Sequence, residues 1–377
     1  MTTALSPQVT AVWLKFALAI LAGILMAFSF APFEWWPLSI GAIVLLLYTI
    51  DKATIKQAVV CHYLFALGLF SVGISWLYVS IHTYGGASAA LAVILVLLFV
   101  IFWSISFLPQ AWLYARFIRQ WRHGLVLGYP IIWVLGEWFR GWFLTGFPWF
   151  YLGYSHLQSP LASFAPIAGV LAVSLVACLL ATFLFCLLVK RRKRYGVLSL
   201  SVFFLALGAA ELEFVTPGKT IQVAAVQGNI DQHSKWQRSM VMPIVNHYRG
   251  LTEAVWGVDL VVWPEAAITV LRSDATSLLA PLRQISQAKD TALLTGIPDL
   301  NDQGRFLNSA VVIGNTPGQY VKQRLVPFGE YVPFERYLRG LIRFFDLPMS
   351  RNVAGSPGQT PLMAGDISLS VSICYEV

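Results

Sequence analysis

The chain ends with SLSVSICYEV, Ser368–Val377, which combines a strand pattern with reactive side chains. Apolar residues alternate with serines here, a period of two that is typical of a half-buried strand: Leu369, Val371 and Ile373. We predict that this strand carries Cys374 to its end, with Tyr375 and Glu376 directly behind it. A cysteine beside an acid is a candidate nucleophile, although a lone cysteine more often packs as a small hydrophobic residue. Choosing between a nucleophile and a packed residue requires the other residues of the chain.

The composition is that of a protein with several membrane spans. Of 377 residues, 57% are hydrophobic and 12% are charged, and the mean hydropathy is +0.68. The net charge of +8 is unevenly distributed, because residues 1–214 hold 12 of the 26 Lys and Arg but only five of the 18 Asp and Glu. Residues 215–377 are therefore nearly neutral. The basic charge belongs to membrane loops, and nothing favours nucleic-acid binding.

Seven apolar segments occur in the first half, most of them near the ~20 residues that a bilayer requires. They lie at about residues 11–31, 37–50, 57–80, 88–115, 124–144, 161–189 and 196–214. We therefore predict an all-α transmembrane domain of about seven helices over residues 1–214, followed by a second domain over residues 215–377.

Basic residues gather in alternate loops between these segments. They form three groups: Lys52 and Lys56, Arg116 to Arg122, and the run Lys190–Arg194 (KRRKR). The positive-inside rule places these loops in the cytoplasm, so an odd number of spans puts the residues after Glu213 on the opposite side. Because ATP is not available there, we expect any group transfer to use an activated or membrane-resident donor.

Polar features within the apolar half are few, and each allows two interpretations. Glu137, close to Arg140 in GEWFRG, favours a structural pair or an interfacial anchor over a transport role. The aromatic loop GFPWFYLGYSH, residues 146–156, suits an interfacial belt and equally an entrance for lipid. A channel or transporter normally shows more polar residues or broken helices, which lowers that class.

Strands and helices alternate beyond a turn at Thr216–Gly218. Apolar runs predict strands at Ile221–Val226, Leu260–Trp263, Ala292–Gly296, 308–314 and Gln319–Lys322. Helices are expected at Met240–Ala254 and 275–288. The alternation indicates an α/β sheet with helices packed on it.

Two further charged residues, Glu265 and Lys322, stand at predicted strand ends. Each alone is more often a solvated surface residue, but with Cys374 they form a complete set for acyl transfer. A thiol with the usual pKa of ~8.5 is only a few per cent ionised near pH 7. A carboxylate can accept its proton and return it to a leaving group, and a fixed ammonium can depress the thiol pKa and stabilise an oxyanion. We therefore predict Cys374 as nucleophile, Glu265 as base and acid, and Lys322 as electrostatic stabiliser.

The remaining cysteines lie in apolar runs and are expected to pack there: Cys61, Cys178 and Cys186. Because Cys374 is the only cysteine of the second half, that half cannot contain an internal disulfide. The six histidines are scattered without metal-ligand spacing, so neither a metal nor another cofactor is expected.

Three motifs follow the apolar half in order: WPE (263–265), LVPFGEYVP (325–333) after Lys322, and SICYE (372–376). They resemble the carbon–nitrogen hydrolase (nitrilase) superfamily with its Glu–Lys–Cys triad. Behind a multi-span bundle they are similar to the apolipoprotein N-acyltransferase family of bacterial inner membranes. The resemblance covers nearly the whole chain and implies a periplasmic α/β/β/α sandwich carrying the three residues in the roles given above.

The resemblance also implies partners and supporting residues. It implies a ping-pong reaction, in which Cys374 takes an acyl chain from a phospholipid as a thioester. The α-amine of a lipoprotein's diacylglyceryl-cysteine then receives the chain as an amide, and the enzyme is expected to be a monomer. Supporting roles fall to four residues: Glu330, Tyr375 and Glu376 around the oxyanion site, and Trp236 in binding lipid substrates.

Family members continue well past the nucleophile, whereas this chain stops three residues after Cys374. We therefore expect a domain apparently truncated at its C-terminus, with missing strands and a poorly supported cysteine turn. Two other functions remain open. One is a membrane-tethered amidase or hydrolase that gives the acyl group to water, and the other is a non-enzymatic membrane assembly or transport protein.

Overall fold

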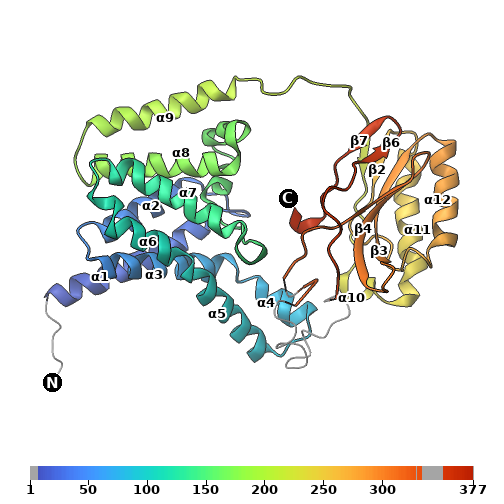
Figure 1. Ribbon diagram of the computed structural model, residues 1–377, viewed down its shortest axis with the longest axis horizontal. Coiled ribbons are helices and arrows are strands. Elements are labelled where there is room, and N and C mark those ends of the chain that lie inside the picture. Colours follow the sequence, from blue (N-terminus) through green and yellow to red (C-terminus); the bar gives the residue numbers. More distant parts are fainter. Residues whose placement is uncertain (1–6, 328, 333–350, 377) are drawn as a thin grey trace. The chain divides into compact units, whose positions relative to one another are not determined.

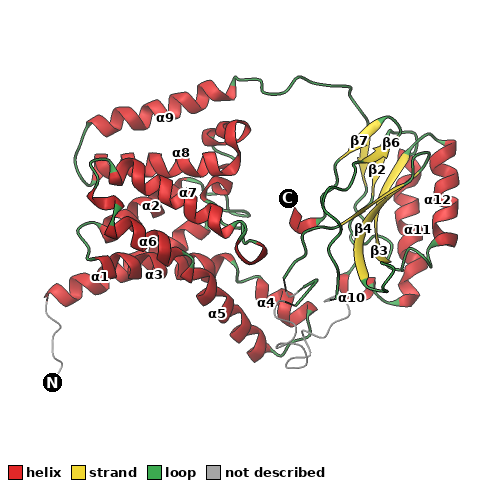
Figure 2. Ribbon diagram, viewed as in Figure 1, coloured by secondary structure: helices red, strands yellow, loops and turns green. Residues whose placement is uncertain are grey.

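The computed structural model describes residues 7–327, 329–332 and 351–376. The chain divides into two compact units, Met1–Thr216 and Pro217–Val377. The first unit is helical, and the second combines a sheet with helices (Figures 1 and 2). Phe328 and Pro333 of the LVPFGEYVP motif, and Val377 at the chain end, lie outside the described residues.

The helical unit contains the apolar segments that the sequence predicts. Its α-helices are α1 (Pro7–Ala27), α2 (Pro37–Ile50), α3 (Ile55–Gly73), α4 (Leu77–Val79), α5 (Ala89–Ile105), α6 (Phe107–Arg116), α7 (Tyr129–Arg140), α8 (Ala165–Leu188) and α9 (Arg194–Ala210). Among the described residues, three stretches are long and apolar enough to cross a membrane: Ile55–Gly73, Ala89–Gln120 and Pro160–Leu188. Shorter apolar helices accompany them at Ala11–Ala27, Pro37–Ile50 and Arg194–Ala210.

The apolar segment at 124–144 is not one continuous helix. A π-helical turn, Gly124–Gly128, precedes the twelve residues of α7, and a 3-10 turn, Phe143–Thr145, follows them. A Cβ atom on Gly124 would lie 1.9 Å from the carbonyl oxygen of Ile118, so only glycine allows this close approach. Hydrophobicity locates the segment but does not reveal these breaks.

Glu137 in α7 has a structural environment. It is 0% exposed, and its Oε1 accepts hydrogen bonds from the indole N–H of Trp133 at 2.9 Å and the backbone N–H of Leu152 at 2.7 Å. Leu152 lies within the aromatic loop 146–156. The carboxylate therefore ties α7 to that loop, which agrees with the structural interpretation of Glu137.

The second unit is built on a mixed five-stranded sheet of order β1-β2-β3-β4-β5. The first three strands are parallel and the last two pairings are antiparallel. The strands are β1 (Val223–Ala225), β2 (Leu260–Val262), β3 (Ala292–Leu300), β4 (Phe306–Ile313) and β5 (Gly318–Val321). The parallel order follows from the helices that connect the first three strands.

Different layers cover the two faces of this sheet. Helices α11 (Val241–Thr252) and α12 (Thr276–Ala288) pack on one face, as Figure 1 shows, and their apolar side chains share a core with Val261, Leu293 and Val311. The short hairpin of β6 (Leu362–Ala364) and β7 (Ile367–Leu369) packs on the other face against Leu260, Ala292 and Val312. Burial is nearly continuous along the central parts of β2 to β4, as expected for strands covered on both faces.

Two strand predictions need correction. The strand expected to run up to Cys374 ends at Leu369, and residues 374–376 form a single 3-10 turn instead. The expected buried strand Ile221–Val226 is reduced to β1 at the edge of the sheet, where Val223 is 50% exposed. An edge strand has a neighbour on one side only, so its apolar pattern does not guarantee burial.

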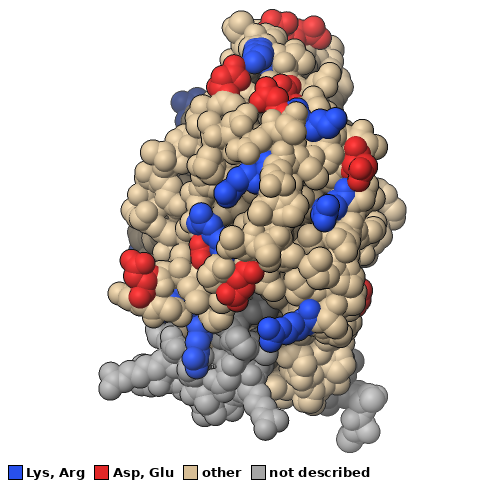
Figure 3. Space-filling model, turned by 90° about the vertical axis from the view of Figure 1, so that its right-hand side faces the viewer, with Lys and Arg blue, Asp and Glu red and all other residues tan. Residues whose placement is uncertain are grey.

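Charge on the face shown in Figure 3 is mixed in sign, with acidic and basic side chains interspersed. This distribution agrees with the nearly equal numbers of acidic and basic residues in the second half of the sequence.

Candidate active site

The ends of β2 and β5 place Glu265 and Lys322 at one edge of the sheet. Lys322 directly follows β5, its backbone N–H donates to the carbonyl oxygen of Asn308 at 2.9 Å, and it is only 1% exposed. Glu265 follows β2 through Trp263 and Pro264. The turn after β2 lies against Gly296, where a Cβ atom would be 2.7 Å from the Glu265 Cα. A side chain at position 296 would therefore displace Glu265.

The Lys322 ammonium lies between two carboxylates. Its Nζ is 2.9 Å from Oε2 of Glu330 and 3.8 Å from Oε1 of Glu265. Glu330 Oε2 also accepts the backbone N–H of Val326 at 2.8 Å, which fixes the carboxylate on the loop after β5. The buried cation is thus both neutralised and held in place.

Asn308 of β4 joins the two carboxylates and was missed in the sequence. Its Nδ2 donates one hydrogen bond to Glu265 Oε1 at 2.7 Å and another to Glu330 Oε1 at 2.8 Å. The available signal was its position at the start of the apolar run NSAVVIG, because asparagine is depleted in strands. The amide orients both carboxylates relative to Lys322.

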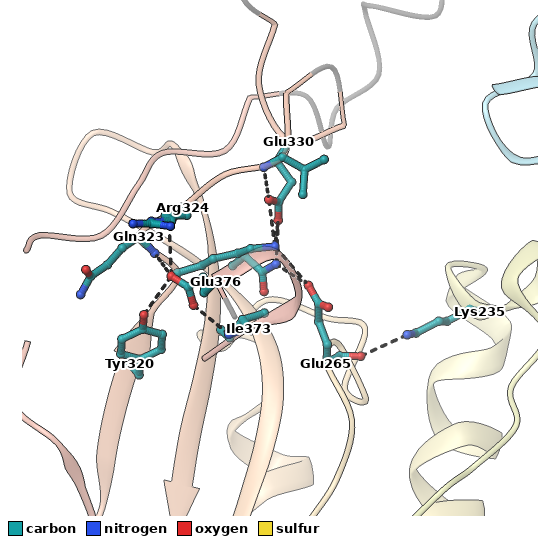
Figure 4. A network of polar contacts seen from close by, with 11 residues as sticks. Lys235, Glu265, Tyr320, Gln323, Arg324, Glu330, Ile373 and Glu376 are labelled. Atoms are coloured by element: carbon teal, nitrogen blue, oxygen red, sulfur yellow. Dashed lines mark hydrogen bonds and ion pairs between the residues drawn. The ribbon is translucent and has the colours of Figure 1, made fainter. Parts of the chain in front are cut away.

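Glu376 holds the cysteine turn against the end of β5. Its carboxylate accepts hydrogen bonds from four donors: the Tyr320 hydroxyl at 2.9 Å and the backbone N–H groups of Gln323, Arg324 and Ile373. Burial, together with the hydrogen bond to Glu376 and its charge, raises the pKa of Tyr320 to about 12, so this hydroxyl remains a donor at neutral pH. Figure 4 shows Glu376 among these groups, bridging two segments far apart in sequence.

Cys374 is exposed and adopts a left-handed backbone conformation with φ of 54°. Partial burial of the thiol is the main cause that raises its pKa, and the charge of Glu265 raises it further, while Lys322 acts in the opposite direction. Lys322 does lower the pKa of the Cys374 thiol, as expected. The combined effect of burial and of the nearby carboxylates is larger, so the pKa of the thiol is raised and not depressed. Since the thiol is protonated at neutral pH, it needs a base before it can attack.

The remaining predicted site residues lie around this cluster. Trp236, on the loop after α10 (Gln232–Lys235), is 40% exposed and its ring lies 5.9 Å from the Lys235 ammonium. Tyr375 is half-buried, and burial raises the pKa of its phenol. The structure therefore groups Glu265, Lys322 and Glu330 by direct contact, whereas Trp236 neighbours Lys235, whose ammonium donates to the Glu265 carbonyl oxygen.

The arrangement provides the parts that acyl transfer by a cysteine requires. It combines an exposed thiol, a carboxylate that is 42% exposed at its side chain, and a fixed buried cation. Among the described residues, no group of three or more His, Cys, Asp or Glu could hold a metal ion.

Comparisons with known proteins agree with both halves of the chain. The model for the apolipoprotein N-acyltransferase N-terminal domain matches residues 22–183, and the carbon-nitrogen hydrolase model matches residues 222–377. An apolipoprotein N-acyltransferase of Pseudomonas syringae pv. tomato is 40% identical over 97% of this chain and 74% of its own length. The chain belongs to the apolipoprotein N-acyltransferase family.

Other members of this family show the same extent of similarity. The apolipoprotein N-acyltransferase of Azotobacter vinelandii is 42% identical over 97% of this chain and 73% of its own length, and that of Vibrio cholerae is 36% identical over 95% and 74%. These apolipoprotein N-acyltransferases are acyltransferase enzymes with a carbon–nitrogen hydrolase domain. The family resemblance inferred from WPE, LVPFGEYVP and SICYE is confirmed.

Proposed function

We propose that this protein moves an acyl chain from a phospholipid to the N-terminal α-amine of a diacylglyceryl-cysteine in an apolipoprotein. The relatives' names give the class of acceptor. The single observation that carries the proposal is the Lys322 ammonium held between Glu265 and Glu330, whose charges act on the exposed thiol of Cys374. An ion cluster with only a structural role does not require an exposed, protonated cysteine within reach of its charges.

In the first half-reaction Cys374 attacks the ester carbonyl of the phospholipid. Glu265 accepts the thiol proton as the C–S bond forms, and Lys322 stabilises the oxyanion. The ester C–O bond then breaks, the proton passes from Glu265 to the departing alkoxide, and a lysophospholipid leaves. The product is a thioester on Cys374.

In the second half-reaction the acceptor amine attacks this thioester. Glu265 takes a proton from the nitrogen as the C–N bond forms and gives it to the sulfur as the C–S bond breaks, which regenerates the thiol. An ester is exchanged for a thioester and then for an amide, so no ATP is required. Glu330 and Asn308 position the charged groups, Glu376 and Tyr375 support the cysteine turn, and Trp236 contacts lipid.

The proposal includes the location and architecture of the enzyme. The basic loops favour a periplasmic catalytic domain over residues 215–377 behind a transmembrane domain over residues 1–214 in the bacterial inner membrane. The two-sided sheet cover, with helices on one face and a hairpin on the other, is compatible with half of an α/β/β/α sandwich. We propose a monomer that needs no cofactor.

Mass spectrometry of the detergent-solubilised protein tests the chemistry. Incubation with phospholipid is expected to add one acyl chain to the peptide containing Cys374, and a diacylglyceryl-cysteine peptide is expected to remove it and become N-acylated. Release of free fatty acid without N-acylated peptide would instead support a hydrolase. An absence of any adduct, with full activity in Cys374→Ser, would overturn the proposed nucleophile.

A further inference from the structure

Lys235 contacts the backbone of the proposed base from outside the triad. It ends α10, a short helix whose first turn is capped by the Asp231 carboxylate, which accepts the Ser234 N–H at 2.9 Å. The Lys235 ammonium donates to the main-chain carbonyl oxygen of Glu265 at 3.2 Å. Figure 4 shows Lys235 reaching this carbonyl, while the Glu265 carboxylate points to the other side, toward Glu330.

The described part of the chain provides no counterion for Lys235. Among the described residues, no carboxylate oxygen lies within 4.0 Å of its ammonium, in contrast to Lys322. Half-burial lowers the pKa of Lys235, and the more distant charge of Glu265 opposes this only in part. A desolvated ammonium without an anion is unfavourable, so a ligand that supplies the anion would be bound favourably.

The ammonium also has unused hydrogen-bonding capacity. Lysine offers three N–H donors, and the described contacts use one of them, on the Glu265 carbonyl oxygen. The neighbouring indole of Trp236 is 40% exposed and offers an apolar surface beside the charge. A cation with two donors that no described residue uses, next to an exposed aromatic ring, suits an amphipathic anion.

We propose that Lys235 binds the phosphodiester of the donor phospholipid, an inference that rests on the proposed function. A phosphate held by Lys235 lies at the backbone end of Glu265, and the carboxylate at the other end serves the reaction. In the donor, the glycerol links the phosphate to the acyl ester, as the main chain and side chain of Glu265 link the Lys235 contact to the carboxylate. The phosphate contact therefore directs the ester toward Cys374, with Trp236 packing against the glycerol and the first methylenes.

This role predicts an effect on one half-reaction only. The phosphate leaves with the lysophospholipid, so it is absent when the acceptor amine attacks the thioester. A residue that merely positioned Glu265 through its carbonyl would affect both half-reactions and every acyl donor equally. The two roles can therefore be separated with donors that differ only in the phosphate.

The experiment measures acyl-adduct formation on Cys374 by intact-protein mass spectrometry, using the full chain in detergent. Phosphatidylglycerol is compared with a diacylglycerol that carries the same acyl chains. For Lys235→Met, we expect the phosphatidylglycerol concentration for half-maximal acylation to rise at least about tenfold more than that for diacylglycerol, because one charge-assisted contact is lost. Lys235→Arg is expected to restore most of this selectivity, and Lys289→Met, which removes an exposed charge at the end of α12, is the matched control.

The outcomes separate the inference from the proposed function. Equal losses with both donors, or a slower transfer to the acceptor peptide from preformed acyl-enzyme, would overturn phosphate binding and leave a positioning role. Unchanged selectivity in Lys235→Met would overturn it as well. If the wild-type protein forms no adduct with either donor while its fold is intact, the proposed function itself fails.

Discussion

Among the residues that the structure describes, each unit contains one fully buried Lys or Arg: Arg140 near Glu137 in the helical unit, and Lys322 in the α/β unit. Arg140 lies over aromatic rings, 4.8 Å from the centroid of Phe107, and its Nε and Nη1 have no hydrogen-bond partner within the part of the chain that the structure describes. Lys322 instead contacts two carboxylates and is coupled to an exposed thiol. Burial of a charge is therefore not what marks a reactive site. The difference lies in whether the charge acts on a group that substrate can reach.

Replacement of the reactive thiol gives the largest expected effect. Cys374→Ser should reduce acyl transfer by roughly 10⁴-fold or more, since the nucleophile is lost while the ion cluster remains. Cys178→Ser is the matched control, because Cys178 is buried in the helical unit. Acylated peptide is quantified by mass spectrometry. Equal activity of the two variants would contradict the assignment of Cys374, and so of the α/β unit, as the site of the reaction.

Removal of the buried ammonium is expected to have the next largest effect. Lys322→Met should slow acylation by about 10²–10³-fold, because the oxyanion loses its electrostatic stabiliser. It should also lower the free energy of unfolding by about 3–5 kcal/mol, since Glu330 loses its counterion and keeps only the hydrogen bonds from Asn308 and Val326. Single-turnover acylation and thermal unfolding in detergent measure the two effects.

The double variant Lys322→Met with Glu330→Gln separates these effects. Without the unpaired carboxylate, most of the stability should return, whereas acylation should remain slow. Recovery of acylation along with stability would mean that Lys322 is structural, like Arg140, and the contrast between the two cations would disappear.

The sequence predicts which charged residues form the site better than it predicts the long-range hydrogen bonds that hold them in place. Strand ends place Glu265 and Lys322 correctly, because two successive antiparallel pairings make β5 run in the same direction as β2, so that their carboxyl ends lie at one edge. Asn308 was missed because its role depends on an antiparallel strand, β4, that brings the amide between two carboxylates from other segments. The turn at Cys374 was mistaken for a strand end because the contacts of Glu376 with the residues after β5, which hold it, are long-range.

The pH dependence of thiol reactivity gives a smaller and directional effect. Because the pKa of Cys374 is raised, its alkylation by iodoacetamide should accelerate as pH increases through that pKa. Lys322→Met removes the charge that lowers the pKa, so the profile should move to higher pH. Glu265→Gln removes a charge that raises it, so the profile should move to lower pH. The other three cysteines are buried, which makes Cys374 the expected site of modification.

A shift in the same direction for both variants would contradict the placement of opposite charges around the thiol. Peptide mapping of the alkylated protein checks that the measured rate belongs to Cys374. Cys374→Ser provides the background rate.

The smallest expected effect on acylation comes from the other buried cation. Arg140→Met keeps an apolar side chain beside Phe107 but removes the charge near Glu137, so it should lower the Tm of the protein in detergent. The rate of acyl-adduct formation per folded molecule should stay within about twofold of wild type, because an interaction outside the site alters the folded fraction and not the barrier. Glu137→Gln combined with Arg140→Met should recover part of the lost Tm. If Arg140→Met instead slows acylation as strongly as Lys322→Met at equal folded fraction, the helical cluster takes part in the reaction and the distinction between the two cations is wrong.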